Sequence, residues 1–440
     1  MRDYAVLLPY YDTNRYSVHS LLACIDGSRL WDVYVVENPS RDTLLKLVSY
    51  LSSRYKKVVI GVSFSTIMLT DNSFLDTILS LNKYKRRNVV VVAGGPHASG
   101  DPLGTIVKLG FDVAVIGEGE ETLPELLETL FLGGDPCRVK GLFLECSGRL
   151  VYTGSRGYVE LDKYPPFPYW RILVGPIEIT RGCPYGCFYC QVSYMHGFTP
   201  RHRGIDAILE YVEVLGRLGY RDVRFITPNG LGYGLTGKSR EPAIDVLEEL
   251  FYRLSIASRR YGLRIFYGTF PSEVRPEHLN RETARLLRKY VSNREVIIGA
   301  QSGSNRVLEL INRGHSIEDV YNATDYALEQ GFRPSIDFII GLPGETRDDL
   351  YETLAAIERL VRKKCRIHLH TFMPLPGTPF ACKEPVSVPS WFKKRVYRII
   401  GSGYGYGQWV RQERIAWRIV ELRRNGIIMS CREYIVDKEG

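Results

Sequence analysis

Three cysteines crowd into eight residues of the chain and offer thiolate ligands to a metal. Cys183, Cys187 and Cys190 lie at spacings of four and three, in a segment that Gly182 and Gly186 allow to turn tightly. Thiolates at this spacing can hold one face of an iron–sulfur cube. Because a cube has four irons, three protein ligands leave one iron open to an external ligand.

A zinc site is the alternative for this cluster. A structural zinc site takes four protein ligands, and His196 and His202 lie close enough in the sequence to supply the fourth. The other cysteines are scattered: Cys24, Cys137, Cys146, Cys365, Cys382 and Cys431. A cytosolic chain of this size needs no disulfides. The cysteines therefore predict one metal site plus single packing cysteines.

The composition is that of an ordinary globular protein. With 440 residues, 45% of them hydrophobic and 24% charged, two or three domains are expected. The chain opens without a secretory signal pattern, and its longest nearly apolar stretch, Val58–Leu69, is too short to span a bilayer. We therefore expect a cytoplasmic protein with no membrane span. The net charge of +9 permits an anionic partner.

Residues 1–135 alternate short Val- and Ile-rich runs with segments of helical spacing. The expected strands are Tyr4–Leu8, Val33–Val36, Val58–Val62, Val89–Ala93 and Val113–Ile116; the expected helices are Arg41–Tyr55, Asp71–Arg86 and Glu121–Leu132. Continuous apolar runs are typical of buried parallel strands, so this pattern predicts a doubly wound, Rossmann-like sheet. Ligands of such sheets lie where strands end. Glycines follow the fourth and fifth strands, although they could equally serve only as tight turns.

A linker and a second α/β region follow. Residues 136–174 contain a hairpin pattern, Val139–Glu145 with Arg149–Thr153, and then a Pro-rich stretch, Tyr164–Trp170. Residues 175–380 hold six further strand candidates: Ile177–Thr180, Val223–Thr227, Arg264–Tyr267, Val296–Ala300, Ile336–Ile340 and Ile367–Thr371. Six strand–helix repeats predict a partial (β/α)6 TIM-type barrel with its active site at the carboxyl ends of the strands. The cysteine cluster begins directly after the first of them.

The cysteine motif resembles the signature of a known superfamily. Cys-x3-Cys-x2-Cys, with the aromatic Tyr189 before the last cysteine, is similar to the motif of radical S-adenosylmethionine enzymes, and the resemblance runs from about Ile177 to Pro379. It implies that Cys183, Cys187 and Cys190 hold a [4Fe–4S] cluster whose open iron binds S-adenosylmethionine. One electron then cleaves the sulfonium and releases a 5′-deoxyadenosyl radical. The resemblance also implies a low-potential electron donor of the flavodoxin or ferredoxin type.

Strand-end segments further along resemble the same superfamily and imply contacts to S-adenosylmethionine. Thr227–Gly230 matches a loop that touches the methionyl amine, Gly299–Gly303 matches a ribose or methionine segment, and Ile336–Thr346 matches a strand and turn that border adenine. The cofactor-binding positions implied are Tyr189, Asn229, Gly230, Gln301, Ser302, Ile339, Gly341 and Pro343. Arg313-Gly314-His315 follows a pattern that relatives share, without an assigned role. No catalytic residue is predicted.

The first domain resembles the cobalamin-binding domain of one branch of this superfamily, an archaeal-type group of mostly unassigned substrate. The resemblance rests on Ala93–His97 and Ile116–Thr122, and it implies that Gly94, Gly95, Gly117 and Gly119 bind cobalamin. The chain lacks the Asp-x-His-x-x-Gly motif expected after the first strand. His19 is therefore a poor candidate for a cobalt ligand. Cobalamin bound without a protein histidine is expected, and a domain that binds nothing is the alternative.

Residues 381–440 form a basic extension rich in aromatic side chains. Arginines and rings together suit RNA, where they meet phosphates and bases. The alternative is a pair of amphipathic helices that closes the bottom of the barrel. Their buried side would comprise Ile415, Trp417, Ile419, Val420 and Leu422.

Three functions remain open on the sequence. The first is a cobalamin-dependent methyltransferase or a related C–H functionalising enzyme. The second is a methylthiotransferase-like enzyme acting on RNA or protein, although such enzymes hold a second cluster on three amino-terminal cysteines and here Cys24, Cys137 and Cys146 are widely separated. The third is a non-catalytic nucleic-acid-binding protein with a structural iron–sulfur cluster. No motif identifies the substrate.

Overall fold

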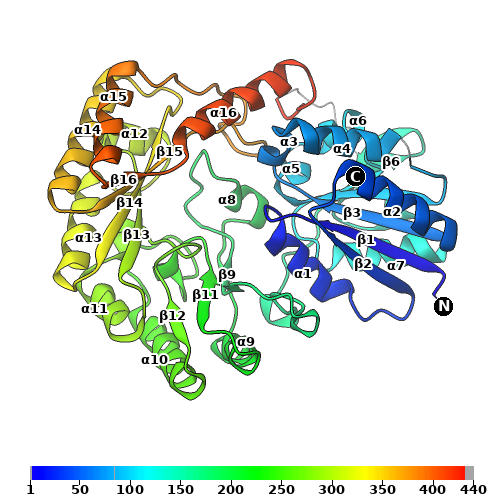
Figure 1. The fold of residues 1–440 in the computed structure, drawn as a ribbon, viewed down its shortest axis with the longest axis horizontal. Helices are drawn as coiled ribbons and strands as arrows, with labels where there is room; N and C mark the ends of the chain where they lie inside the picture. The colour runs from blue at the N-terminus through cyan, green and yellow to red at the C-terminus, as the bar shows by residue number, and fades with distance from the viewer. Residues whose placement is uncertain (1, 84, 432–440) are drawn as a thin grey trace.

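The computed structural model describes residues 2–83 and 85–431. Two α/β units lie side by side (Figure 1), an amino-terminal unit in blue and cyan and a barrel-like unit in green and yellow. The helix α8 (Gln191–His196) lies between them, and the helix α16 (Trp409–Arg424) runs from one to the other.

The amino-terminal unit is built on a seven-stranded sheet of order β2-β1-β3-β4-β5-β6-β7. Its strands are β1 (Tyr4–Tyr10), β2 (Trp31–Glu37), β3 (Lys57–Ser63), β4 (Val89–Gly94), β5 (Val113–Val115), β6 (Leu142–Cys146) and β7 (Arg149–Tyr152). The first five are parallel, which confirms the doubly wound prediction. The β6–β7 hairpin pairs antiparallel with β5 and so extends this sheet, where the sequence placed it in a linker.

Helices cover both faces of this sheet. They are α1 (Arg15–Ile25), α2 (Arg41–Arg54), α3 (Thr66–Leu69), α4 (Asn72–Lys83), α5 (Gly95–Gly100), α6 (Pro102–Val107) and α7 (Thr122–Leu132). Leu7 of β1 packs with α2 and α4, whereas its neighbour Leu8 packs with α1 and α7. Since both faces are covered, the strands are apolar along their whole length. The helix α1, between β1 and β2, was not predicted, because no helical pattern was noted there.

The barrel-like unit contains all six expected strands, in two larger sheets and one two-stranded sheet. Its strands are β8 (Ile177–Glu178), β9 (Thr180–Arg181), β10 (Arg201–His202), β11 (Asp222–Ile226), β12 (Arg264–Phe266), β13 (Glu295–Gln301), β14 (Arg333–Ile340), β15 (Arg366–Thr371) and β16 (Gly405–Tyr406). One sheet has the order β12-β11-β8 and the other β13-β14-β15-β16. A single parallel bridge, Val274 with Ile298, joins them. The short β9 pairs only with β10.

Helices surround these sheets on the outside. They are α9 (Ile205–Arg217), α10 (Ile244–Tyr261), α11 (Arg281–Tyr290), α12 (Asn305–Leu310), α13 (Ile317–Glu329), α14 (Arg347–Arg362) and α15 (Ser390–Gly401). Short 3-10 turns occupy Pro136–Arg138, Leu161–Lys163, Tyr169–Arg171, Gly230–Gly232 and Pro276–His278. Alternate residues of each long strand pack against the helices and form one large hydrophobic core, which leaves the other strand face toward the barrel interior.

Only one of the two helices of the carboxyl-terminal extension packs on the barrel, where a pair of helices closing its bottom was the alternative expected. Phe392 and Val396 of α15 join the barrel core, whereas α16 leaves it. Thr371, at the carboxyl end of β15, donates to the Trp409 carbonyl and to Gln412 at the start of α16. From there α16 crosses to the amino-terminal unit, where Ile419 and Leu422 join its core (Figure 1). The expected apolar side is buried at Ile419, Val420 and Leu422, while Ile415 and Trp417 are half-buried. Residues 409–431, which comprise α16 and the residues after it, therefore join the two units. We call this segment the strap.

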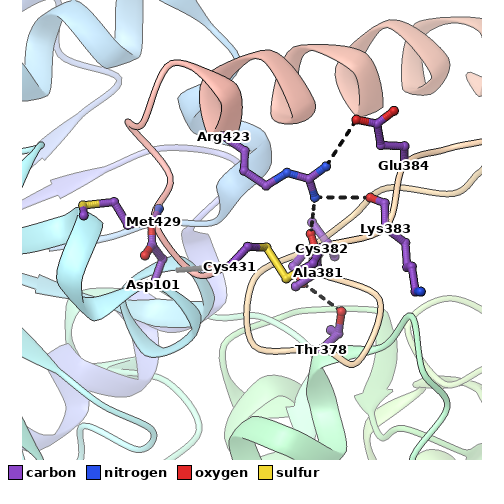
Figure 2. The surroundings of a disulfide bond; sticks show 10 residues. Asp101, Thr378, Ala381, Cys382, Lys383, Glu384, Arg423, Met429 and Cys431 are labelled. Carbon is purple, nitrogen blue, oxygen red and sulfur yellow. Dashed lines mark hydrogen bonds and ion pairs between the residues drawn. A yellow bond between two sulfur atoms is a disulfide. The ribbon is translucent and has the colours of Figure 1, made fainter. Parts of the chain in front are cut away.

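Two disulfides correct the expectation of single packing cysteines. Cys137 pairs with Cys146, and Cys382 pairs with Cys431 with 5.5 Å between their Cα atoms. Figure 2 shows that the second bond joins the end of the strap to the loop after β15, beside Arg423. Pairing of cysteines 49 residues apart depends on the path of α16, which the sequence does not reveal.

No helix among the described residues is long and apolar enough to cross a membrane.

Candidate functional site

The three clustered cysteines lie in one loop between β9 and α8. The Cys183 amide donates to the Gly197 carbonyl at 3.1 Å and the Cys190 amide to the Cys187 carbonyl at 3.0 Å, so the loop is closed by its own backbone. Gly182 has φ +85° and a Cβ there would lie 2.6 Å from the Thr199 carbonyl oxygen. Only glycine fits at this position. All three cysteines are free thiols.

Two buried arginines face the central cysteine. Arg313 Nη1 lies 3.6 Å from the Cys187 sulfur. Burial raises the pKa of a thiol, yet Arg313 and Arg275 outweigh it and hold the pKa of Cys187 below its usual value. Burial raises the pKa of Cys190 to about 12. Arg275 Nη1 is buried without a hydrogen-bond partner. Arg275 also forms an ion pair with the buried Glu277. The guanidinium groups of Arg275 and Arg313 together carry one positive charge more than Glu277 compensates, which fits an anionic group bound to the thiolates.

The separation of the sulfur atoms favours a cluster over zinc. Four thiolates on one zinc ion lie about 3.8 Å apart, given Zn–S bonds of about 2.3 Å. Within residues 2–83 and 85–431, one group of at least three potential metal ligands has its ligand atoms within 4.8 Å of one another: Asp337, His368 and His370. The three cysteines do not form such a group, so their sulfur atoms do not converge on one ion. Thiolates that bind different irons of a cube need not converge.

The two histidines considered as zinc ligands are occupied elsewhere. His202 Nδ1 contacts the Thr180 hydroxyl at 2.9 Å, and its Nε2 contacts the Leu235 carbonyl at 2.7 Å. His196 Nδ1 contacts Glu118 at 3.2 Å. Among the described residues, neither histidine forms a group of three close ligand atoms with the cysteines, and the donor set fits an iron–sulfur cluster.

The residues predicted to border adenine and the cysteine loop come together. Tyr189 and Ile339 both pack against a small apolar cluster beneath the loop, which includes Leu342 and Phe372. Gly341 has φ +75° and a Cβ there would lie 2.8 Å from the Val386 carbonyl oxygen, so this turn requires glycine. Pro343 follows in the same turn and is half-buried.

The Asn229–Gly230 segment lies across a small cavity from the cysteine loop. Cys183 and Asn229 both line this space, which measures about 280 Å³ including solvent at its mouth. The Asn229 side chain is already engaged, since Oδ1 accepts from the Arg275 amide at 3.1 Å and Nδ2 contacts His278 at 2.8 Å. A Cβ at Gly230 would lie 2.5 Å from the Ser272 carbonyl oxygen. Contacts from this segment to a cofactor would therefore use its backbone.

Gln301 and Ser302 end β13 in different environments. Gln301 has a left-handed φ of +72° and is half-buried. Ser302 is fully buried, and its hydroxyl contacts Thr353 at 3.3 Å and accepts from the Ser304 amide at 3.2 Å. The serine side chain thus shapes the turn, while Gln301 remains available to a ligand.

The four glycines predicted to bind cobalamin line one cavity between the two units. The space measures about 980 Å³ including solvent at its mouth, and its floor is the carboxyl end of the amino-terminal sheet. Gly94, Gly95, Gly117 and Gly119 contribute from the sheet side, and Met195 of α8 is among the residues on the opposite side. A Cβ at Gly94 would meet no atom within 4 Å. Because these glycines have no side chains, they leave this part of the cavity open, and the cavity fits a large flat group.

Buried ion pairs close the rim of this cavity and join the units. Arg181 donates to Glu120 at 2.6 Å and to Glu178 at 2.7 Å, and Arg201 donates to Glu118 at 2.5 Å. Burial alone would raise the pKa of Glu118, but its contacts to His196 and Arg201 hold it at about 2. The sequence reasoning missed this network, because its partners lie 61 and 83 residues apart.

His19 is not a cobalt ligand in this arrangement. Its Nε2 contacts the Tyr10 hydroxyl at 3.0 Å, burial lowers the pKa of His19 to about 4, and the side chain is not among those that line the cavity. The observation agrees with the absence of the histidine motif.

Comparison with known families matches both units. The Radical SAM superfamily model matches residues 177–357, and the B12 binding domain model matches residues 10–127. A radical SAM domain implies a [4Fe–4S] cluster and S-adenosylmethionine as cofactors, and a B12-binding domain implies cobalamin.

The similar curated proteins include archaeal proteins of unassigned activity and bacterial RNA-modifying enzymes. An uncharacterized methyltransferase of Pyrococcus horikoshii is 25% identical over 360 residues, which cover 79% of this chain and 73% of the relative. An uncharacterized protein of Methanopyrus kandleri is 28% identical, and the match covers 67% of this chain and 63% of the relative. A tRNA-2-methylthio-N(6)-dimethylallyladenosine synthase of Thermotoga petrophila is 31% identical over 211 residues, 46% of this chain and 43% of the relative.

Solved structures share the fold across both units. TsrM of Kitasatospora setae, a radical S-adenosylmethionine methyltransferase solved with cobalamin and a [4Fe–4S] cluster, has a TM-score of 0.67 at 17% identity, covering 86% of this chain and 74% of that chain. OxsB, solved with aqua-cobalamin and S-adenosylmethionine, has a TM-score of 0.64 at 15% identity, covering 97% and 61%. The chain contains a radical SAM domain, and a B12-binding domain precedes it.

Proposed function

We propose that this chain is a cobalamin-dependent radical SAM methyltransferase or a closely related C–H functionalising enzyme. The observation that carries the proposal is the shared cavity, which has the glycines of the B12-binding domain on one wall and α8, the helix that follows the cysteine loop, on the other. A group held on the glycine floor would thus lie directly beside the cluster site. When bound, the cluster with S-adenosylmethionine supplies a substrate radical and cobalamin supplies a methyl group.

The residues of the chain hold, neutralise and enclose these groups. Cys183, Cys187 and Cys190 are the proposed cluster ligands, and Arg275 and Arg313 balance the thiolate charge. Burial of this loop excludes water, which strengthens those charge interactions.

The cofactor positions predicted from the sequence remain part of this proposal. Tyr189 and Ile339 would flank S-adenosylmethionine from the apolar cluster that they share, and Gln301 would approach it from the end of β13. A flavodoxin- or ferredoxin-type protein is the proposed electron donor.

The two other functions receive less support from the structure. A second cluster would need Cys24, Cys137 and Cys146 together, but Cys137 and Cys146 form a disulfide while Cys24 lies on α1 and donates to the Ser20 carbonyl. In the basic extension, many cations are held by the protein itself: Lys393 by Glu413, Arg395 by Glu358 and Arg424 by Glu384. The similarity to methylthio-synthases nevertheless makes iron content a necessary measurement.

The test is anaerobic reconstitution with iron, sulfide and hydroxocobalamin, followed by incubation with S-adenosylmethionine and dithionite. We expect about four irons per chain and formation of 5′-deoxyadenosine and S-adenosylhomocysteine. The variants Cys183→Ala, Cys187→Ala and Cys190→Ala should lose both products, whereas Cys365→Ala, a buried free cysteine outside the loop, should keep them. About eight irons per chain would favour the methylthiotransferase, and intact S-adenosylmethionine under strong reduction would contradict an enzymatic role.

A further inference from the structure

Two exposed aromatic side chains lie against the cysteine loop. Tyr194 is on α8 and Phe198 follows that helix; they are 36% and 51% exposed, and their rings meet edge to face with 5.4 Å between centroids. A Cβ at Gly186 would lie 2.7 Å from Cε1 of Phe198, so this ring rests on the residue that precedes Cys187. Single exposed apolar side chains are ordinary, whereas exposed ones that gather in one place mark an interaction surface.

Hydrogen bonds join the aromatic pair to the backbone of the loop. The Tyr194 hydroxyl donates to the Gly186 carbonyl at 2.9 Å, and Asn312 Nδ2 donates to the same carbonyl at 2.9 Å. Burial raises the pKa of Tyr194, and the charges of Cys187 and Cys190 raise it further. Tyr194 therefore lies within electrostatic reach of the thiolates that would hold the cluster, while part of its ring is open to solvent.

A hollow with a positively charged lining adjoins the aromatic pair. It measures about 580 Å³ including solvent at its mouth. Asn312 belongs to both features, because it bonds to the Gly186 carbonyl and also lines the hollow. Cations outnumber anions in the lining, whose charged residues are Lys238, Arg240, Arg313 and Glu277.

Lys238 is the cation of this hollow that is available to a partner. It is exposed, and among the residues that the structure describes it has no ion-pair partner. The Arg240 side chain is 60% exposed but is bound to Asp319 at 2.5 Å. The Glu277 side chain is buried and bound to Arg275 at 2.5 Å, so it does not compensate Lys238. The accessible excess charge beside the aromatic pair is therefore positive.

An aromatic contact flanked by a free cation suits a transient electron-transfer partner. Complexes of that kind bury little area, and interfaces place apolar groups at the centre and charges at the rim. Rim charges attract the partner and set its register. Because the aromatic pair rests on the residue before Cys187, a redox group placed on it is separated from the cluster site by the loop itself. A flavin with an exposed apolar edge matches such a contact.

We propose that a flavodoxin with an acidic face docks on Phe198, Tyr194 and Lys238 and reduces the cluster from this side. The hydroquinone of its flavin loses one electron and the oxidised cluster gains it, with no bond formed or broken. The aromatic pair contacts the flavin edge, and Lys238 contacts a carboxylate of the partner. The inference rests on the proposed function, because it gives the electron donor of that reaction a place to bind.

The test measures the affinity of a bacterial flavodoxin for the reconstituted protein at low and at high ionic strength. In Lys238→Glu the affinity should fall about tenfold at low ionic strength, and the loss should shrink at high ionic strength because an exposed charge is screened. In Phe198→Ser it should fall about tenfold at both, since an apolar contact is not screened. The controls Lys46→Glu, exposed on α2, and Tyr252→Ser, 51% exposed on α10, should bind like the wild type.

A second measurement separates docking from chemistry. With dithionite, a small reductant that needs no docking surface, all four variants should form 5′-deoxyadenosine at the rate of the wild type. With reduced flavodoxin as the sole reductant, the rate should fall in Lys238→Glu and Phe198→Ser alone. An iron content of about four per chain shows that the cluster site of each variant is intact.

Three results would overturn the inference: a wild type that does not bind flavodoxin, flavodoxin affinity that is unchanged in both Lys238→Glu and Phe198→Ser, or a ferredoxin that binds on this surface in place of flavodoxin. If Phe198→Ser loses its cluster, Lys238→Glu alone decides. The proposed function fails separately, when the dithionite-reduced wild type leaves S-adenosylmethionine intact.

Discussion

Arg181, next to the cysteine loop, donates to Glu120 of the B12-binding domain with 2.6 Å between Nη2 and Oε1. Both side chains are buried, so removing the cation leaves carboxylates without compensation. We expect Arg181→Met to destabilise the protein by about 3–5 kcal/mol. Urea unfolding measures this, with Arg217→Met as the control because Arg217 pairs with Glu213 on an exposed helix surface. Equal, small losses in both variants would show that the network does not hold the units together.

Glu345 should make stability fall as pH rises. Burial raises the pKa of Glu345 to about 8, and its Oε1 has no partner. In the unfolded chain the carboxyl ionises near pH 4.3. Between that value and about 8 the folded state binds more protons, so stability decreases with increasing pH.

The isosteric variant Glu345→Gln tests this assignment. Its free energy of unfolding should exceed that of the wild type at pH 9 and approach it at pH 5, with a difference that grows by about 1 kcal/mol per pH unit between these limits. Parallel stability–pH profiles for the two proteins would show that Glu345 does not titrate in this window.

The Cys382–Cys431 disulfide should contribute more to the stability of the protein than the Cys137–Cys146 disulfide does. It closes 49 residues, whereas Cys137–Cys146 closes nine. Loop-closure entropy gives about 4 kcal/mol for the longer loop and about 2.6 kcal/mol for the shorter. Thermal unfolding of Cys431→Ser and Cys146→Ser measures both.

The strap disulfide also predicts a local effect. Cys431→Ser should expose the Arg423 region, where Arg423 donates to the Ala381 carbonyl at 2.6 Å (Figure 2), to faster amide exchange. Unchanged exchange in the last turn of α16 together with an unchanged melting temperature would contradict the stabilising role.

The sequence predicts the strands and the turn glycines well, because both are local. Val- and Ile-rich runs become β3 and β4, and Gly94 and Gly117 end strands at the same sheet edge. The path of the strap could not be predicted in this way. The apolar side of α16 indicates that Ile419 is buried, but not that it is buried in the core of the amino-terminal unit. Disulfide partners were missed for the same reason.

The group formed by Asp337, His368 and His370 had a signal that was overlooked. His368 and His370 are two apart in an expected strand, so they share a face. Asp337 lies in the neighbouring strand, but only the register of β14 with β15, which pairs Asp337 with His368, brings it into contact. Register depends on tertiary packing and is not fixed by either strand alone.

The most direct test of cobalamin binding between the two units is to fill the shared cavity from its glycine floor. Gly94 has φ −149°, which any residue adopts, and a Cβ there meets nothing within 4 Å, so Gly94→Leu should fold and project into the cavity. Gly157→Leu is the control, since Gly157 is exposed and equally unobstructed. After anaerobic reconstitution and gel filtration, absorbance should show one cobalamin per chain in the wild type and in Gly157→Leu, and at least tenfold less in Gly94→Leu. A colourless wild type, or full cobalamin in Gly94→Leu, would contradict cobalamin binding in this cavity.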